Sequence, residues 1–116
     1  MRHRNKKKIL SRRASTRNSL FRNLETSLIL YEHIRTTKAK SKVLRSRVEK
    51  LITLGKKNNL NVKRRLLQEL FIKKAADKVL EVLGPKYKER NGGYTRIVPI
   101  GTRKGDGAEM VVIEFV

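Results

Sequence analysis

The sequence predicts one α+β domain that follows a basic arm. Between residues 20 and 83, apolar side chains recur three or four positions apart, as on the buried face of an α-helix. Residues 94–100 and 110–116 are instead rich in β-branched and aromatic residues, with glycines between them, which is typical of a β-hairpin. A length of 116 residues with 38% hydrophobic content suits a single domain whose helices bury apolar surface against a small sheet.

Residues 1–14 form the predicted arm. Ile9 and Leu10 are its only large aliphatic residues, so the arm cannot bury enough surface to fold alone. Nine basic residues precede the first acid of the chain, Glu25. We therefore expect an extended segment that becomes ordered on a partner.

The domain, residues 15–116, is expected to begin with a helix. Ser15 or Thr16 can cap its N-terminus. Its apolar positions follow a helical spacing: Leu20, Leu24, Leu28 and Tyr31. A short β stretch is expected after it, at residues 34–37.

Two or three further helices are expected in the middle of the chain. Thr37 is a good cap for the second, and Gly55 is a natural residue to follow its end. The third begins near Asn61, and the helical pattern continues until Gly84-Pro85 stops it. No Gly or Pro interrupts residues 61–83, so the sequence leaves open whether this stretch is one helix or two.

The C-terminal hairpin spans about residues 94–116. Arg103 and Lys104 lie in its long connection and form a basic tip. Pro99 lacks an N–H to donate to a neighbouring strand, so we expect it at a sheet edge or a bulge.

The residue inventory argues against an enzyme, a metal site and a bound cofactor. There is no Cys, and the two histidines, His3 and His33, have no cluster of other ligands around them. The acids are scattered near Lys or Arg, as in surface ion pairs. The glycines of residues 101–107 sit between strands, so they indicate a turn rather than a nucleotide cradle. No apolar run approaches the ~18 residues of a membrane span.

A net charge of +20, from thirty bases and ten acids, predicts a polyanionic partner and favours nucleic acid. Few aromatic residues argue against a sheet that stacks single-stranded bases. The candidate RNA-binding residues are those of the arm, the second helix, the Gly92–Arg96 segment and the hairpin tip: Arg2, His3, Arg4, Lys6, Lys7, Lys8, Arg12, Arg13, Arg17, Arg22, Lys38, Lys42, Arg45, Tyr94, Arg96, Arg103 and Lys104.

Some of these candidates can be explained without RNA binding, by an ordinary structural role. The bases of the second helix could form a solvated helix face. In the Gly92–Arg96 segment, Tyr94 could stack on a base or ribose while Arg96 holds a phosphate. A turn followed by a strand with one core tyrosine explains the same residues. Taken alone, the segment favours this structural explanation. The three bases that open the third helix oppose its dipole, which mildly favours a phosphate partner.

An ordered set of short motifs runs through nearly the whole chain. They are Met1-Arg-His-Arg4, Phe21-Arg-Asn23, Ile34-Arg-Thr-Thr-Lys-Ala-Lys40, Leu51-Ile-Thr-Leu54, Leu83-Gly-Pro85, Gly92-Gly-Tyr-Thr-Arg-Ile97, Gly101-x-Arg-x-Gly-Asp106 and Ile113-Glu114. Each is weak alone, but the set in this order resembles the bacterial large-ribosomal-subunit protein seventeen family. Residues 67–75 match that pattern poorly.

The resemblance implies a two-layer α/β domain with the order α-β-α-α-α-β-β and a small mixed three-stranded sheet. It also implies a non-enzymatic, structural role in the cytoplasmic ribosome. The partners would be large-subunit ribosomal RNA of the 23S type, near the nascent-chain exit region, and neighbouring ribosomal proteins, notably large-subunit protein thirty-two. No membrane and no small-molecule substrate is implied.

Two other functions are compatible with a basic chain of this size. A DNA-architectural or other non-ribosomal nucleic-acid-binding module would need a recognition helix or a dimer seam, and neither is clear in the sequence. An RNA-processing enzyme would need an acid/base or metal constellation, which is not evident.

Overall fold

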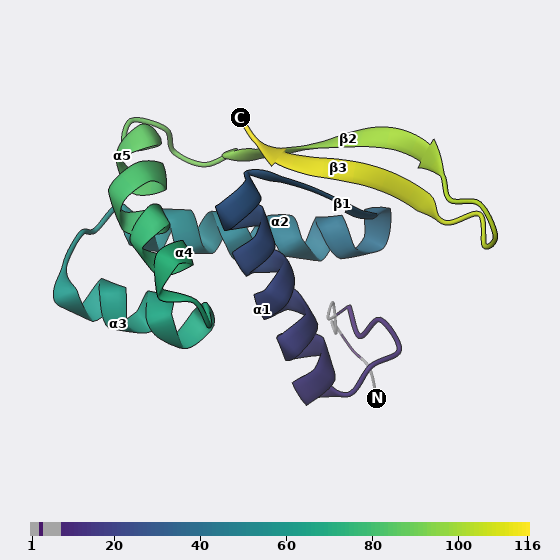
Figure 1. Ribbon diagram of the computed structural model, residues 1–116, viewed down its shortest axis with the longest axis horizontal. Coiled ribbons are helices and arrows are strands. Elements are labelled where there is room, and N and C mark those ends of the chain that lie inside the picture. Colours follow the sequence, from purple (N-terminus) through teal and green to yellow (C-terminus); the bar gives the residue numbers. More distant parts are fainter. Residues whose placement is uncertain (1–2, 4–7) are drawn as a thin grey trace.

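A computed structural model describes residue 3 and residues 8–116 of the chain (Figure 1). The elements, in order, are α1 (Ala14–Tyr31), β1 (His33–Thr37), α2 (Lys38–Gly55), α3 (Leu60–Glu69), α4 (Lys73–Lys78), η1 (Val79–Leu83), α5 (Gly84–Lys86), β2 (Thr95–Thr102) and β3 (Glu109–Phe115). Because α4, η1 and α5 follow one another without a gap, they form one helical run. The predicted order α-β-α-α-α-β-β is therefore confirmed.

The helices lie on one side of the sheet, and α2 runs beneath it, so the domain has the expected two layers (Figure 1). α2 supplies the centre of the core through Leu44, Val48 and Ile52, which are fully buried. Phe21 and Ile113 close the core from α1 and β3. Tyr31, expected on the apolar face of the first helix, is instead 68% exposed.

The sheet has the strand order β1-β3-β2, and both pairings are antiparallel. The expected mixed sheet is therefore wrong. The two outer strands do run in the same direction, but β3 lies between them, so the sheet contains no parallel ladder. Pro99 is in an edge strand, next to a register shift between Pro99 and Gly101 that leaves Ile100 as an extra residue. The placement expected for Pro99 is confirmed on both counts.

Helix starts depend less on capping side chains than the sequence suggested. α1 is preceded by Arg13, which makes no side-chain capping bond, so the cap expected at Ser15 or Thr16 is wrong. Thr37 precedes α2 as expected, also without a side-chain capping bond. Among the helices of the described residues, α3 alone has a side-chain cap: the Asn59 Oδ1 accepts a hydrogen bond from the Val62 N–H at 2.9 Å.

Residues 61–83 belong to two helical runs. Leu70 leaves the helix with φ −106° and ψ 124°, and Ile72 is also extended. Leu70 is fully buried, while Phe71 and Ile72 are exposed. The break carries no Gly or Pro because its cause is tertiary: the chain leaves the helix so that Leu70 enters the core.

The second run passes through Gly84-Pro85, where an end was expected, and continues to Lys86. A π-turn makes this possible: the Gly84 N–H donates to the Val79 carbonyl, five residues back. Gly55 is not a left-handed residue after α2 but the last residue of the helix. An added Cβ at Gly84 would lie 2.7 Å from the Gly55 carbonyl oxygen, so the two glycines allow α2 and this run to cross closely.

Candidate nucleic-acid interface

A groove between the start of α2 and the hairpin brings the arm and the second helix together. Lys8, Lys38 and Lys42 line it, and Glu109 lies at the base of the hairpin. The Lys38 Nζ is 3.4 Å from a Glu109 carboxylate oxygen, and both side chains are at least half exposed. We call this surface, lined by Lys8, Lys38 and Lys42, the arm groove. Two segments predicted separately to bind RNA thus meet on one surface.

The three longest helices of the described residues carry no acids at their N-termini. The first turns of α1, α2 and α3 have none. α2 instead starts with Lys38 and has Lys40 and Lys42 close behind. A helix N-terminus already carries a partial positive charge, so added bases raise the local repulsion. An external anion such as phosphate relieves it.

Part of the predicted arm can be placed. Arg2, Arg4, Lys6 and Lys7 lie outside the described residues. His3, Lys8 and Arg13 are exposed. Residues 10–12 form a turn rather than an extended segment, and Leu10 packs against the core.

Three of the other basic candidates make contacts within the protein. The Arg12 Nη1 donates to the Leu10 carbonyl at 2.9 Å, and the Arg17 Nη1 to the Arg12 carbonyl at 3.5 Å. The Arg22 guanidinium lies 5.2 Å from the centre of the Phe71 ring. The Arg22 Nε is buried, with no hydrogen-bond partner among the described residues. Arg12 and Arg17 thus stabilise the start of α1, and Arg22 packs against the connection between α3 and α4, so less of their charge is available to a ligand than the sequence suggested.

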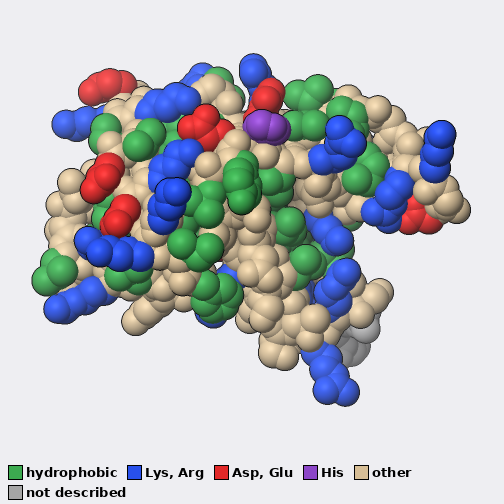
Figure 2. Space-filling view, in the orientation of Figure 1, with side chains coloured by type: hydrophobic (Ala, Val, Ile, Leu, Met, Phe, Trp, Pro, Cys, Tyr) green, Lys and Arg blue, Asp and Glu red, His purple; other side chains and the backbone are tan. Residues whose placement is uncertain are grey.

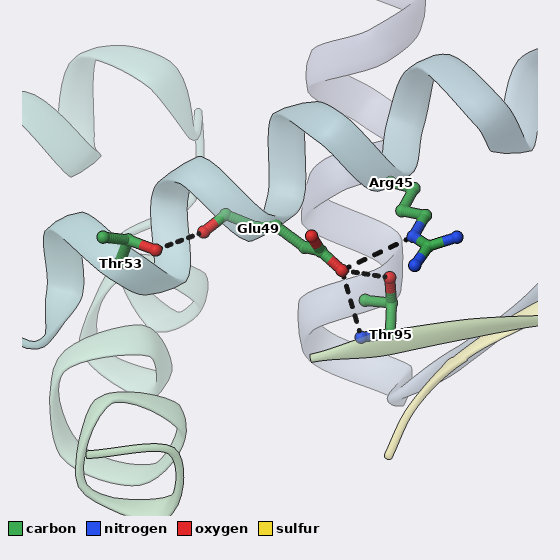
Figure 3. A network of polar contacts seen from close by, with 4 residues as sticks. All are labelled: Arg45, Glu49, Thr53 and Thr95. Atoms are coloured by element: carbon green, nitrogen blue, oxygen red, sulfur yellow. Dashed lines mark hydrogen bonds and ion pairs between the residues drawn. The ribbon is translucent and has the colours of Figure 1, made fainter. Parts of the chain in front are cut away.

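Arg45 belongs to a polar network that fixes β2 to α2 (Figure 3). The Glu49 Oε1 accepts hydrogen bonds from the Thr95 hydroxyl at 3.0 Å and the Thr95 N–H at 3.4 Å, and lies 3.6 Å from the Arg45 Nε. The Thr53 hydroxyl donates to the Glu49 carbonyl at 3.0 Å. Glu49 carried no signal of this role in the sequence, because Thr95, which it binds on β2, lies forty-six residues away.

Tyr94 is a core residue, which corrects its place among the RNA-binding candidates. Its side chain is 1% exposed, so its ring has no free face for a base. The ring lies 5.2 Å from that of Tyr87, centre to centre, and the hydroxyl is 3.3 Å from the Thr53 hydroxyl. Its neighbour Arg96 is exposed on β2 but pairs with Glu114 across the sheet at 2.7 Å.

The hairpin tip is basic and well structured. The Arg103 Nη2 donates to the Asp106 Oδ2 at 2.5 Å, and the Ala108 N–H donates to the same carboxylate at 3.2 Å. Chiefly through the Arg103 hydrogen bond, the pKa of Asp106 is lowered to about 2. Arg103 thus holds the turn, and Lys104 is the unpaired cation of the tip among the described residues.

A second basic cleft, absent from the sequence predictions, lies between α2 and α3. Its volume is about 590 Å³, and four cations line it: Arg47, Lys50, Lys57 and Arg65. Lys50 lies near the end of α2, whereas Lys57 lies two residues beyond Gly55, the last residue of the helix, so no helical spacing in the sequence joined the two. The contribution of α3 also depends on tertiary packing and had no signal in the sequence.

Figure 2 shows Lys and Arg side chains on both halves of the visible face, from the helices to the hairpin tip. Within residues 3 and 8–116, no group of three or more His, Cys, Asp or Glu side chains could hold a metal ion. In the same part of the chain, no helix is both long and apolar enough to cross a membrane.

The domain is similar in sequence to known proteins over its whole length. The chain is 52% identical over 117 residues to large ribosomal subunit protein bL17 of Hydrogenobaculum sp., of which it covers 99%. It is 47% and 48% identical to the proteins of the same name from Geobacter metallireducens and Geotalea daltonii, and spans 65% and 64% of their lengths. The family model for ribosomal protein L17 matches residues 20–116. This chain belongs to the ribosomal protein L17 family.

Proposed function

We propose that this protein is a structural component of the large ribosomal subunit, where it binds folded ribosomal RNA and supports translation. Its relatives are named as proteins of that subunit, and the match to the family model covers most of the chain. The role is non-enzymatic and belongs to the ribosome in the cytoplasm. The finer placement follows from the family: RNA of the 23S type near the nascent-chain exit region, beside large-subunit protein thirty-two.

The arm groove is the observation that carries RNA binding. It joins an arm lysine to two lysines at the N-terminus of α2, and only Lys38 of the three has an ion-pair partner among the described residues. Neutralising phosphates with such side chains releases condensed counterions. If ~6–10 phosphates are contacted, affinity falls by roughly 10³–10⁵ between 50 and 200 mM salt.

The arm can be tested without disrupting the domain. Residues 1–13 precede α1, and among those that the structure describes, residues 3 and 8–13, Leu10 is the one that packs against the core. One variant deletes residues 1–13; a second keeps Leu10 and Arg12 and replaces every other Lys and Arg of residues 1–13 by Gln. Both are expected to give a folded domain by circular dichroism and reduced occupancy in purified large subunits after high-salt washes.

The second variant separates charge from packing. If occupancy falls only on deletion, the arm acts through Leu10 rather than through its cations. Occupancy unchanged in both variants contradicts arm-mediated RNA binding. Gel-shift competition between ribosomal RNA and duplex DNA tests the alternative of a DNA-binding module, which predicts equal or stronger competition by DNA.

A further inference from the structure

We propose that the cleft between α2 and α3 is a second binding site for RNA backbone phosphate, separate from the arm groove. The inference rests on the proposed ribosomal role. We call Lys50, Lys57 and Arg65, which line this cleft, the cleft cations. Its volume of about 590 Å³ lies in the range of ligand-binding sites in proteins.

The cleft cations are free to bind an anion. All three side chains are exposed, and none forms an ion pair within the part of the chain that the structure describes. An unpaired surface cation keeps its full charge for a ligand, whereas the paired Arg96 and Arg103 share theirs with a carboxylate. Three unpaired cations around one concave surface fit an RNA backbone, which carries one phosphate charge per nucleotide.

The carboxylates in the cleft do not cancel this charge. Glu25 pairs with Arg47 at the base, and Glu69 lies 4.0 Å from the same guanidinium. Glu25 is only 1% exposed, so it neutralises Arg47 from beneath and cannot meet a ligand. Four cations and two carboxylates leave a net +2, carried by the side chains at the rim.

The cleft and the arm groove lie toward opposite ends of α2. Lys38 and Lys42 are in the first turns of this helix, whereas Lys57 lies two residues beyond its end. Eighteen residues at 1.5 Å each make α2 about 27 Å long. Figure 1 shows α3 at one end of α2 and the N-terminal segment near the other. Nucleotides that contact the cleft are therefore different from those that contact the arm.

The test compares two triple variants of the full chain. The cleft variant carries Lys50→Ala, Lys57→Ala and Arg65→Ala. The control carries Lys74→Ala, Lys88→Ala and Arg90→Ala, which removes the same three charges from other exposed positions. Neither set includes an ion-paired or buried side chain, so both proteins are expected to retain the thermal unfolding midpoint of the parent.

Binding to transcribed large-subunit ribosomal RNA is measured as a function of salt. Each lost phosphate contact lowers the slope of log affinity against log salt by about one. The cleft variant should lose two to three of these units, which amounts to an affinity loss of roughly 10²–10³ at 0.1 M salt relative to 1 M. The control should lose less than one unit. Hydroxyl-radical footprinting should show that the cleft variant and the arm variants lose protection at different nucleotides.

The outcomes separate this inference from the proposed function. If the parent binds ribosomal RNA and both triple variants have equal slopes, the cleft is not an RNA site, although the ribosomal role stands. If the cleft variant binds RNA like the parent but fails to enter the subunit, the cleft contacts an acidic protein, and the inference is overturned. If the parent shows no salt-dependent preference for ribosomal RNA, the proposed function itself fails.

Discussion

Alanine at Gly84 directly perturbs the close crossing of α2 and the second helical run. The new Cβ would lie 2.7 Å from the Gly55 carbonyl oxygen and 3.1 Å from that of Val79. Both atoms are backbone, so the helices must separate. Overpacking costs about 1–3 kcal/mol, and contact with backbone favours the upper value. Alanine regains roughly 0.5–1 kcal/mol in a helix, which leaves a net destabilisation of about 2 kcal/mol.

Thermal unfolding followed by circular dichroism measures this effect. The unfolding entropy of a 116-residue chain at about 2.1 cal/mol/K per residue is roughly 240 cal/mol/K, so 2 kcal/mol lowers the Tm by about 8 °C. An unchanged or raised Tm for Gly84→Ala would refute the close crossing.

Gly55→Ala provides the matched comparison, because its obstacle is a side chain. The added Cβ would lie 2.5 Å from the Val79 Cγ1, and the next atom is at an ordinary 3.4 Å. Combining it with Val79→Ala should therefore recover about 1–2 kcal/mol relative to the sum of the single changes. The combination of Gly84→Ala with Val79→Ala should stay closer to additive, because the obstructing carbonyls remain. Equal coupling in both pairs would contradict the assignment of the two obstacles.

Two further predictions concern Glu25 and Asn59. Burial raises the pKa of Glu25 above 4.5, with Arg47 acting in the opposite direction. The stability from Glu25 is thus full below pH 4.5 and is lost as pH rises through the folded pKa. In urea unfolding, the stability of Glu25→Gln relative to the parent should therefore increase as pH rises above 4.5, and the reverse trend would mean that Arg47 outweighs burial. Asn59→Ala removes the cap of α3 and should cost about 1 kcal/mol in the same assay, whereas Asn59→Asp keeps the acceptor and should cost little.

Local patterns predicted most of the secondary structure. The apolar spacing of Leu44, Val48 and Ile52 marked the buried face of α2, since helical period and burial follow directly from residue order. The edge position of Pro99 followed from its missing N–H. The family followed from an ordered set of motifs, and motif order is itself a sequence property.

The errors fall where distant segments meet. The sequence could not show that β3 lies between β1 and β2, that Leu70 turns into the core, or that the helical run passes Gly84-Pro85. Each depends on packing between residues far apart in the chain, which overrides local preference. In the same way, Tyr94 became a core residue because α2 and Tyr87 enclose it.

By itself, the sequence determined the class of the fold, the strong positive charge and the family, because these reside in composition, short-range periodicity and motif order. Tertiary structure decided which cations meet an acid that lies far away in the chain. It pairs Arg47 with Glu25 and Arg96 with Glu114, while it leaves Lys50, Lys57 and Arg65 unpaired around one cleft. The physical reason is that a charge acts on a ligand through its neighbours in space, and folding sets those neighbours.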